Sequence, residues 1–189
     1  MKRKTRKQII KFIKKPGLIC FLGLATMVFW EYWGKDMGMK ESLGSENIRV
    51  IDGDTIVANG VKIRLKGMDA PESQQKCSYG KNQEIKYLCG KEATTHLRKI
   101  VATKNLECTN EGKDLYERRL SYCYADGTNI NRKMVLDGWA VSYNKEFLVE
   151  ELIAKSSKKG MWKGEFEIPS EWRKKQKGKR KYSSIINIC

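Results

Sequence analysis

The sequence predicts a mainly β fold with helices (α+β): a five-stranded OB-type barrel with about three helices, preceded by a single N-terminal transmembrane segment. Three observations predict it. Short apolar runs of strand length cluster around an Asn-Gly turn, longer stretches follow the helical period, and a charge-free run follows a basic N-terminus. A chain of 189 residues suits one hydrophobic core with appendages.

The expected strands alternate with turn signals. Asn59-Gly60 separates two of them and is the strongest short-range hairpin signal, and Asp126-Gly127 follows the last one. Three strands before a helix and two after it are typical of an OB-type barrel. The expected strands are residues 48–51, 55–58, 61–65, 105–109 and 119–125.

Apolar residues at helical spacing predict three helices. Ala93, Leu97 and Ile100 indicate a helix over residues 90–102. Asn131 is a candidate N-cap for a short helix over residues 132–137. A last helix is expected over residues 146–159, with the inward-facing side chains Phe147, Leu148, Leu152 and Ile153.

The N-terminal region has the pattern of an export signal. Eight basic residues and no acidic residue precede the charge-free run GLICFLGLATMVFW. No small-residue cleavage site follows this run, which favours an uncleaved signal anchor over a removed signal peptide. The folded part would then lie outside the cytoplasm, at the cell surface or in the periplasm, or would be secreted if the signal were cleaved.

The basic charge lies mostly at the two ends of the chain. The formal net charge is +16, yet the middle is nearly neutral, so net charge says little about a substrate. We expect the C-terminal run to be a solvated tail, with a phosphate-binding arm as the alternative. The expected organisation is a basic cytoplasmic tail (1–16), a signal anchor (17–33), a linker (34–46), a folded domain (47–173) and a basic C-terminal tail (174–189).

Four of the six cysteines fall in the expected folded domain. In an oxidising compartment, four cysteines indicate two disulfides. Cys77 and Cys89 flank a local loop, and Cys108 and Cys123 fall in paired strands. We therefore expect the pairs Cys77–Cys89 and Cys108–Cys123, and the other two connectivities stay open.

Four polar clusters lie at the ends of the expected strands. Each one alone has an ordinary explanation as a turn, a loop start or an arginine that reaches solvent. Their order along the chain is more informative than any single cluster. They are Asp52-Gly53-Asp54-Thr55, Arg64, Asp69-Ala70-Pro71-Glu72 and Asp114-Leu115-Tyr116-Glu117-Arg118.

This order resembles the staphylococcal-type nuclease family, also called thermonuclease-like. The matching segments are VIDGDT, RLKGMDAPE and DLYERRLSYCYADG, followed by NINRKMVLDGWA. The four cysteines and the ending KKGMWKGEFEIPSEWR are similar to exported, membrane-anchored bacterial members. The resemblance covers about residues 48–173, and it departs from the family at Glu117, where the family has glycine.

The resemblance implies a calcium-dependent endonuclease. It would hydrolyse phosphodiester bonds of DNA, RNA or both, and leave 3′-phosphate and 5′-hydroxyl ends. Asp54, Asp69 and the backbone carbonyl of Ala70 would hold Ca²⁺, which prefers oxygen ligands. The implied partners are single-stranded or frayed DNA or RNA and, through the N-terminal segment, a membrane; no obligate protein partner is expected.

The resemblance also assigns the chemistry to three side chains. Glu72 would position or deprotonate the attacking water. Arg64 and Arg118 would bind the phosphate and the charge that grows on it in the transition state. Tyr116 would bind a phosphate and Tyr143 would stack on a base, although an ordinary surface aromatic is as good a reading of Tyr143.

Two other function classes stay open. One is a non-catalytic OB-fold module that binds nucleic acid while tethered to a membrane, and the other is a structural domain whose charged residues form only salt bridges. The enzyme is favoured because the chain retains all five charged side chains that the family uses.

Overall fold

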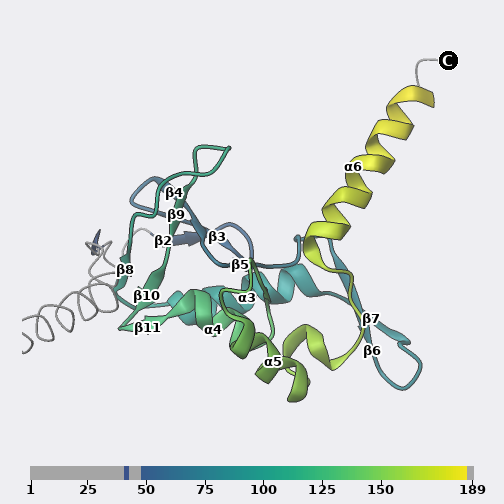
Figure 1. Cartoon of the computed structure of the whole chain (residues 1–189), viewed down its shortest axis with the longest axis horizontal. Helices are drawn as coiled ribbons and strands as arrows, with labels where there is room; N and C mark the ends of the chain where they lie inside the picture. Colours follow the sequence, from purple (N-terminus) through teal and green to yellow (C-terminus); the bar gives the residue numbers. More distant parts are fainter. Residues whose placement is uncertain (1–40, 43–47, 187–189) are drawn as a thin grey trace, which may run out of the picture. The chain divides into compact units, whose positions relative to one another are not determined.

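The computed structural model describes residues 41–42 and 48–186 (Figure 1). The expected basic N-terminal tail and signal anchor, and nearly all of the expected linker, lie outside the described residues. Within the described part, none of the helices has both the length and the apolar character needed to span a bilayer. The fold is mixed, with short strands and helices, as expected.

The first sheet has the strand order β2-β3-β4-β9. The antiparallel β3–β4 pair turns at Asn59 and Gly60, which both have positive φ, as a two-residue hairpin turn requires. β9 pairs with β4 in parallel. The strands are β2 (Ile48–Val50), β3 (Thr55–Ala58), β4 (Val61–Leu65) and β9 (Arg119–Ser121).

A second sheet follows the order β1-β8-β10-β11. Cys108 and Cys123 are direct partners in its β8–β10 pair and form a disulfide. The strands are β1 (Glu41–Ser42), β8 (Leu106–Cys108), β10 (Cys123–Ala125) and β11 (Thr128–Asn129).

The expected closed five-stranded barrel is not found in the described part of the chain. β9 ends at Ser121 in the first sheet and β10 begins at Cys123 in the second, so the single residue Tyr122 carries the chain between two sheets. β8 pairs with β1 and β10 and not with β2, so the two sheets are not joined by a ladder along that edge.

Two further strand pairs complete the β structure. β5 (Met68–Asp69) pairs with β12 (Val141–Ser142). β6 (Lys76–Tyr79) and β7 (Ile85–Leu88) form a hairpin where the sequence predicted only a loop. The expected Cys77–Cys89 disulfide joins this hairpin to the first residue of the next helix.

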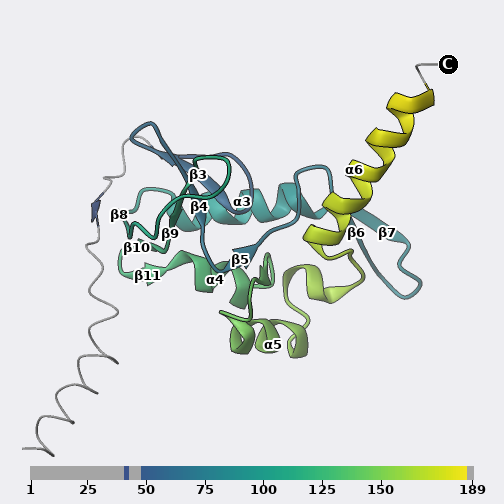
Figure 2. The same ribbon diagram turned by 45° about the horizontal axis from the view of Figure 1, so that its top comes forward.

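The helices are α3 (Cys89–Val101), α4 (Ile130–Leu136), α5 (Leu148–Ser156), a 3₁₀ turn η2 (Gly160–Lys163) and α6 (Pro169–Ile186). α3 contacts both β2 and α4, and Figure 2 shows α3 and α4 near each other. α6 runs through residue 173, where the sequence predicted the end of the folded domain.

Asn131 is not the cap of α4, contrary to the prediction. Asn129 caps this helix by accepting a hydrogen bond from the Arg132 backbone N–H. Asn131 is fully buried; it accepts from the Cys123 N–H and donates to the carbonyls of Lys66 and Ser121. It thus joins the β4–β5 turn to the β9–β10 junction.

The expected orientation of the last helix is wrong, apart from Phe147, which is buried. The face of α5 that contacts the domain carries Glu150 and Glu151, which accept hydrogen bonds from the Arg132 side chain and the Ser142 N–H. Because these carboxylates find partners there, the apolar face turns to solvent. The side chains exposed on that face are Leu148, Val149, Leu152 and Ile153.

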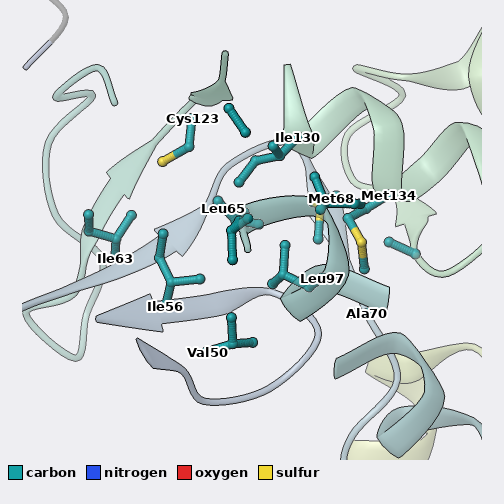
Figure 3. Close-up of a cluster of buried hydrophobic side chains, with 14 of the residues drawn as sticks. Val50, Ile56, Ile63, Leu65, Met68, Ala70, Leu97, Cys123, Ile130 and Met134 are labelled. Carbon is teal, nitrogen blue, oxygen red and sulfur yellow. The ribbon is translucent and has the colours of Figure 1, made fainter. Parts of the chain in front are cut away.

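The hydrophobic core lies between the first sheet, α3 and α4. Ile56, Ile63 and Leu65 point into it from β3 and β4, and Leu97 and Met134 meet them from the two helices (Figure 3). Because the core holds β3, β4 and α3 rigidly, it fixes the polar residues at the ends of these elements.

Candidate active site

Asp54 and Arg64 are brought together by the β3–β4 hairpin. Asp54 directly precedes β3, and Thr55 lies opposite Arg64 in the strand register. Gly53 allows the close approach of the next segment, because a Cβ at this position would lie 2.7 Å from the Cβ of Ala70. The Asp-Gly-Asp-Thr cluster therefore packs directly against the segment that carries Asp69.

Arg64 joins the two buried aspartates. Its Nη1 lies 2.7 Å from Oδ1 of Asp54, and its Nη2 lies 3.0 Å from Oδ1 of Asp69. The Ala70 N–H also lies 3.4 Å from Oδ2 of Asp54. One guanidinium thus spans the two carboxylates that the sequence assigned to metal.

Burial sets the protonation of this cluster. Burial, with contributions from the nearby charges of Asp52 and Asp69, raises the pKa of Asp54 to about 7, although Arg64 opposes the shift. Burial alone would lower the pKa of Arg64, but the charges of Asp54 and Asp69 outweigh it and raise that pKa. Burial, more than the charge of its neighbours, therefore favours a protonated Asp54.

Glu72 is held at the start of α3. A Cβ at Gly90 would lie 1.9 Å from the Glu72 carbonyl oxygen, so only glycine lets the helix approach this closely. The Gln75 N–H donates to that carbonyl over 2.7 Å. The Glu72 carboxylate is 39% exposed, and its Oε1 lies 3.1 Å from Nη1 of Arg173.

Arg118 is positioned by Asp114 from the same loop. The Asp114 carboxylate accepts from Nε of Arg118 at 2.7 Å and from the backbone N–H groups of Tyr116 and Arg118. Burial would raise the pKa of Asp114, but these hydrogen bonds together lower it, so the carboxylate stays charged. Nη1 of Arg118 lies 3.5 Å from the Thr55 hydroxyl, which donates to Asp54 at 2.9 Å.

Glu117 adopts the left-handed conformation, with φ of 57°. This explains why glycine suits the position. The Glu117 carboxylate pairs with Lys113 at 2.8 Å. Arg118 keeps its contact with Asp114, so the departure from the family pattern leaves that arginine in place.

Most of these groups line a single cavity of about 550 Å³. Asp54 and Asp69 lie buried behind its wall. Tyr116 and Tyr143 lie at its edge, 73% and 55% exposed, and the Arg118 guanidinium lies 5.5 Å from the Tyr116 ring centre. The charged and aromatic groups that line the cavity are Arg64, Lys66, Glu72, Asp114, Tyr116, Arg118, Tyr143, Glu146, Arg173 and Lys177.

The donor set fits a calcium ion. Asp54 and Asp69 are only 5% and 2% exposed; Arg64 binds both of them and Arg173 also binds Asp69, so a cation would share these carboxylate oxygens with the two arginines. In the described part of the chain, no three His, Cys, Asp or Glu side chains are grouped to hold a metal unaided. Calcium tolerates such a sparse set because backbone carbonyls, water and phosphate oxygens complete its shell.

The structure adds two basic residues that the sequence did not assign to the site. Arg173 binds Asp69 and Glu72, and Lys177 lines the cavity one helical turn further along α6. No sequence signal marks this contact, because Arg173 lies in a basic run more than one hundred residues from Asp69 and Glu72.

Comparisons with known proteins identify the family. Residues 62–164 match the family model described as staphylococcal nuclease homologue. The chain is 34% identical over 122 residues to the "Succinoglycan biosynthesis protein ExoI" of Rhizobium meliloti, covering 61% of this chain and 63% of that protein. It is 34% identical over 132 residues to an "Uncharacterized endonuclease" of Escherichia coli, covering 65% of this chain and 78% of that protein.

A plant relative aligns over more of the chain. The chain is 28% identical over 164 residues to the "Probable staphylococcal-like nuclease CAN4" of Oryza sativa subsp. japonica, covering 83% of this chain but 31% of that protein. The chain therefore spans less than two thirds of the Rhizobium and rice relatives. The family match over residues 62–164, together with the site geometry, shows that this chain belongs to the staphylococcal nuclease homologue family.

Proposed function

We propose that the chain is a calcium-dependent endonuclease that hydrolyses phosphodiester bonds of DNA, RNA or both and leaves 3′-phosphate and 5′-hydroxyl ends. One observation carries the proposal: a continuous set of contacts links Arg118, Thr55, Asp54, Arg64 and Asp69 beside a single cavity. Relatives that carry the names endonuclease and nuclease support it.

The two arginines bind the phosphate in this proposal. A guanidinium has five N–H donors in a fixed fork, so Arg64 can hold Asp54 and Asp69 and still present donors to the cavity. Arg118 is fixed by Asp114 and faces the same cavity. Both groups stabilise the charge that builds on the phosphate oxygens during attack.

Glu72 accepts a proton from the attacking water as the water oxygen bonds to phosphorus. The bond to the 5′-oxygen breaks, this oxygen leaves as a hydroxyl after gaining a proton from solvent, and the phosphate stays on the 3′ side. Glu72 is exposed enough to reach water and firmly held through its backbone. A calcium ion held by Asp54, Asp69 and the Ala70 carbonyl would polarise the phosphate and neutralise charge.

The aromatic residues at the cavity edge extend the proposal to substrate binding. Tyr143 is exposed and offers a stacking surface for a base, and Tyr116 lies beside the Arg118 guanidinium. Stacking is tolerant of base identity, so low sequence specificity is expected.

We also propose that residues 17–33 anchor the domain at a membrane, outside the cytoplasm. The basic and apolar pattern of the N-terminus supports it, and so do two disulfides, which persist in oxidising compartments. A reporter enzyme fused after Trp33 should be active outside the cytoplasm. A reporter active only in the cytoplasm would contradict the topology.

The nuclease proposal is tested by digesting denatured DNA and RNA with the full-length chain, with calcium or with chelator, and by analysing the product ends. We expect cleavage only with calcium, loss of cleavage in Arg64→Ala, and 3′-phosphate products. Binding of nucleic acid without cleavage would support the non-catalytic module, and 5′-phosphate products would refute the proposed end chemistry.

A further inference from the structure

Arg173 reaches into the candidate active site from α6. Its Nη2 lies 2.8 Å from Oδ2 of Asp69, and its Nη1 lies 3.0 Å from Oδ1 of the same carboxylate. The same Nη1 lies 3.1 Å from Oε1 of Glu72. One guanidinium therefore holds both oxygens of a proposed calcium ligand and the proposed base.

The surrounding structure fixes this arrangement. The Gln75 side-chain amide donates to the Glu167 carbonyl at 2.5 Å, which ties the segment before α6 to the Glu72 loop. Pro169 is buried where α6 begins, and the Arg173 side chain is only 34% exposed. The charges of Asp69 and Glu72 outweigh the effect of burial and raise the pKa of Arg173, so the side chain stays charged.

These contacts are in conflict with a divalent cation on Asp69. The Asp69 carboxylate has two oxygens, and both already accept from Arg173 while one also accepts from Arg64. A cation on Oδ1 would compete with two guanidinium contacts, and a cation on either oxygen would lie beside the positively charged Arg173 and repel it. The cation and Arg173 thus weaken each other.

We propose that Arg173 restrains Glu72 until a divalent cation displaces Arg173 from Asp69. It competes with the divalent cation for Asp69 and holds Glu72 in an ion pair, so that metal binding weakens the hold on Glu72 and frees this carboxylate for water. The inference rests on the proposed function, because it takes Asp69 as a metal ligand and Glu72 as the base. Thermodynamic reciprocity requires that removal of Arg173 strengthens metal binding by as much as the metal weakens the Arg173 contact.

Calcium titration calorimetry on the full-length chain, without nucleic acid, tests the proposal. We expect Arg173→Gln to bind calcium about tenfold more tightly than the wild type, equivalent to about 1.4 kcal/mol at 25 °C. Lys174→Gln is the matched control, because it removes one positive charge from an exposed neighbour on the same helix. It should change the affinity by no more than about twofold, as expected for a screened surface charge.

Asp69→Asn distinguishes a failure of the competition from a failure of the metal site. Weaker calcium binding by Asp69→Asn with unchanged affinity in Arg173→Gln would overturn the competition and leave the metal site standing. Equal binding by Asp69→Asn and the wild type would overturn both. If Arg173→Gln does not fold, Arg173→Lys is used instead. Loss of the bidentate contact with Asp69 should still tighten calcium binding, and an unchanged affinity would overturn the proposal.

A second measurement concerns Glu72. The calcium concentration that gives half-maximal cleavage should fall in Arg173→Gln by the same factor as the calcium dissociation constant. A fall in the dissociation constant without this shift would overturn the restraint on Glu72.

Discussion

Replacement of Arg64 by methionine should destabilise the domain in the presence of chelator. Arg64 binds two carboxylates whose side chains are only 7% and 3% exposed. Breaking a buried ion pair by removing one partner costs about 3–5 kcal/mol. Two features reduce that cost here: Arg173 still binds both oxygens of Asp69, and Asp54 can take up a proton.

We therefore expect the free energy of unfolding to fall by about 2 kcal/mol, which lowers the melting temperature by about 4–8 °C for a chain of this size. Calcium should reduce the difference, because a cation replaces the lost positive charge. Thermal unfolding followed by circular dichroism measures both effects. Lys62→Met is the matched control, since Lys62 is an exposed cation on the same strand.

The cost of removing Arg64 should also depend on pH. The pKa of Asp54 is raised from 3.8 to about 7, so its contribution to stability is full below 3.8 and is lost as pH rises through about 7. Arg64 limits this loss because it lowers the Asp54 pKa. The variant should therefore lose more stability at about pH 8 than at about pH 5. A loss below about 0.5 kcal/mol, or an equal loss at both pH values, would contradict this role of Arg64.

Three further predictions concern other parts of the domain. Replacing Cys108 and Cys123 by serine should lower the free energy of unfolding by about 3 kcal/mol in urea titrations, as a separation of 15 residues implies; an unchanged unfolding midpoint would contradict this. Tyr143→Ala should raise KM about 5- to 100-fold with little change in kcat, whereas Tyr143→Phe should behave as the wild type, because stacking needs only the ring. The same change in KM for both variants would exclude stacking. Glu117→Gly should keep normal cleavage and shift stability by less than about 1 kcal/mol, since relief of the left-handed conformation offsets the added freedom of glycine; lost cleavage would show that Glu117 takes part in the site.

The strands and helices that carry the site were predictable because local signals define them. The Asn59-Gly60 turn fixes the β3–β4 register, and this register places Thr55 opposite Arg64. The apolar period of residues 90–102 correctly predicted α3. Both expected disulfides are present: strand pairing brings Cys108 to Cys123, and the β6–β7 hairpin brings Cys77 close to Cys89 at the start of α3.

The features missed from the sequence depend on tertiary contacts. Glu150 and Glu151 are buried on α5, where Arg132, Lys155 and the Ser142 N–H bind them. The apolar pattern of the helix could not predict these partners and so indicated the wrong face. In the β6–β7 hairpin, Ser78 forms a β-bridge with Glu165, which lies far along the chain. The contact of Arg173 with Asp69 likewise requires the position of α6 to be known.

The most direct test of the account compares cleavage and binding of denatured DNA by the full-length wild type and by Glu72→Gln, both with calcium. We expect the variant to bind DNA as the wild type does, while its cleavage rate falls at least about 100-fold, the usual loss when a general base is removed. Unchanged cleavage by Glu72→Gln would contradict the assignment of Glu72 and with it the proposed mechanism.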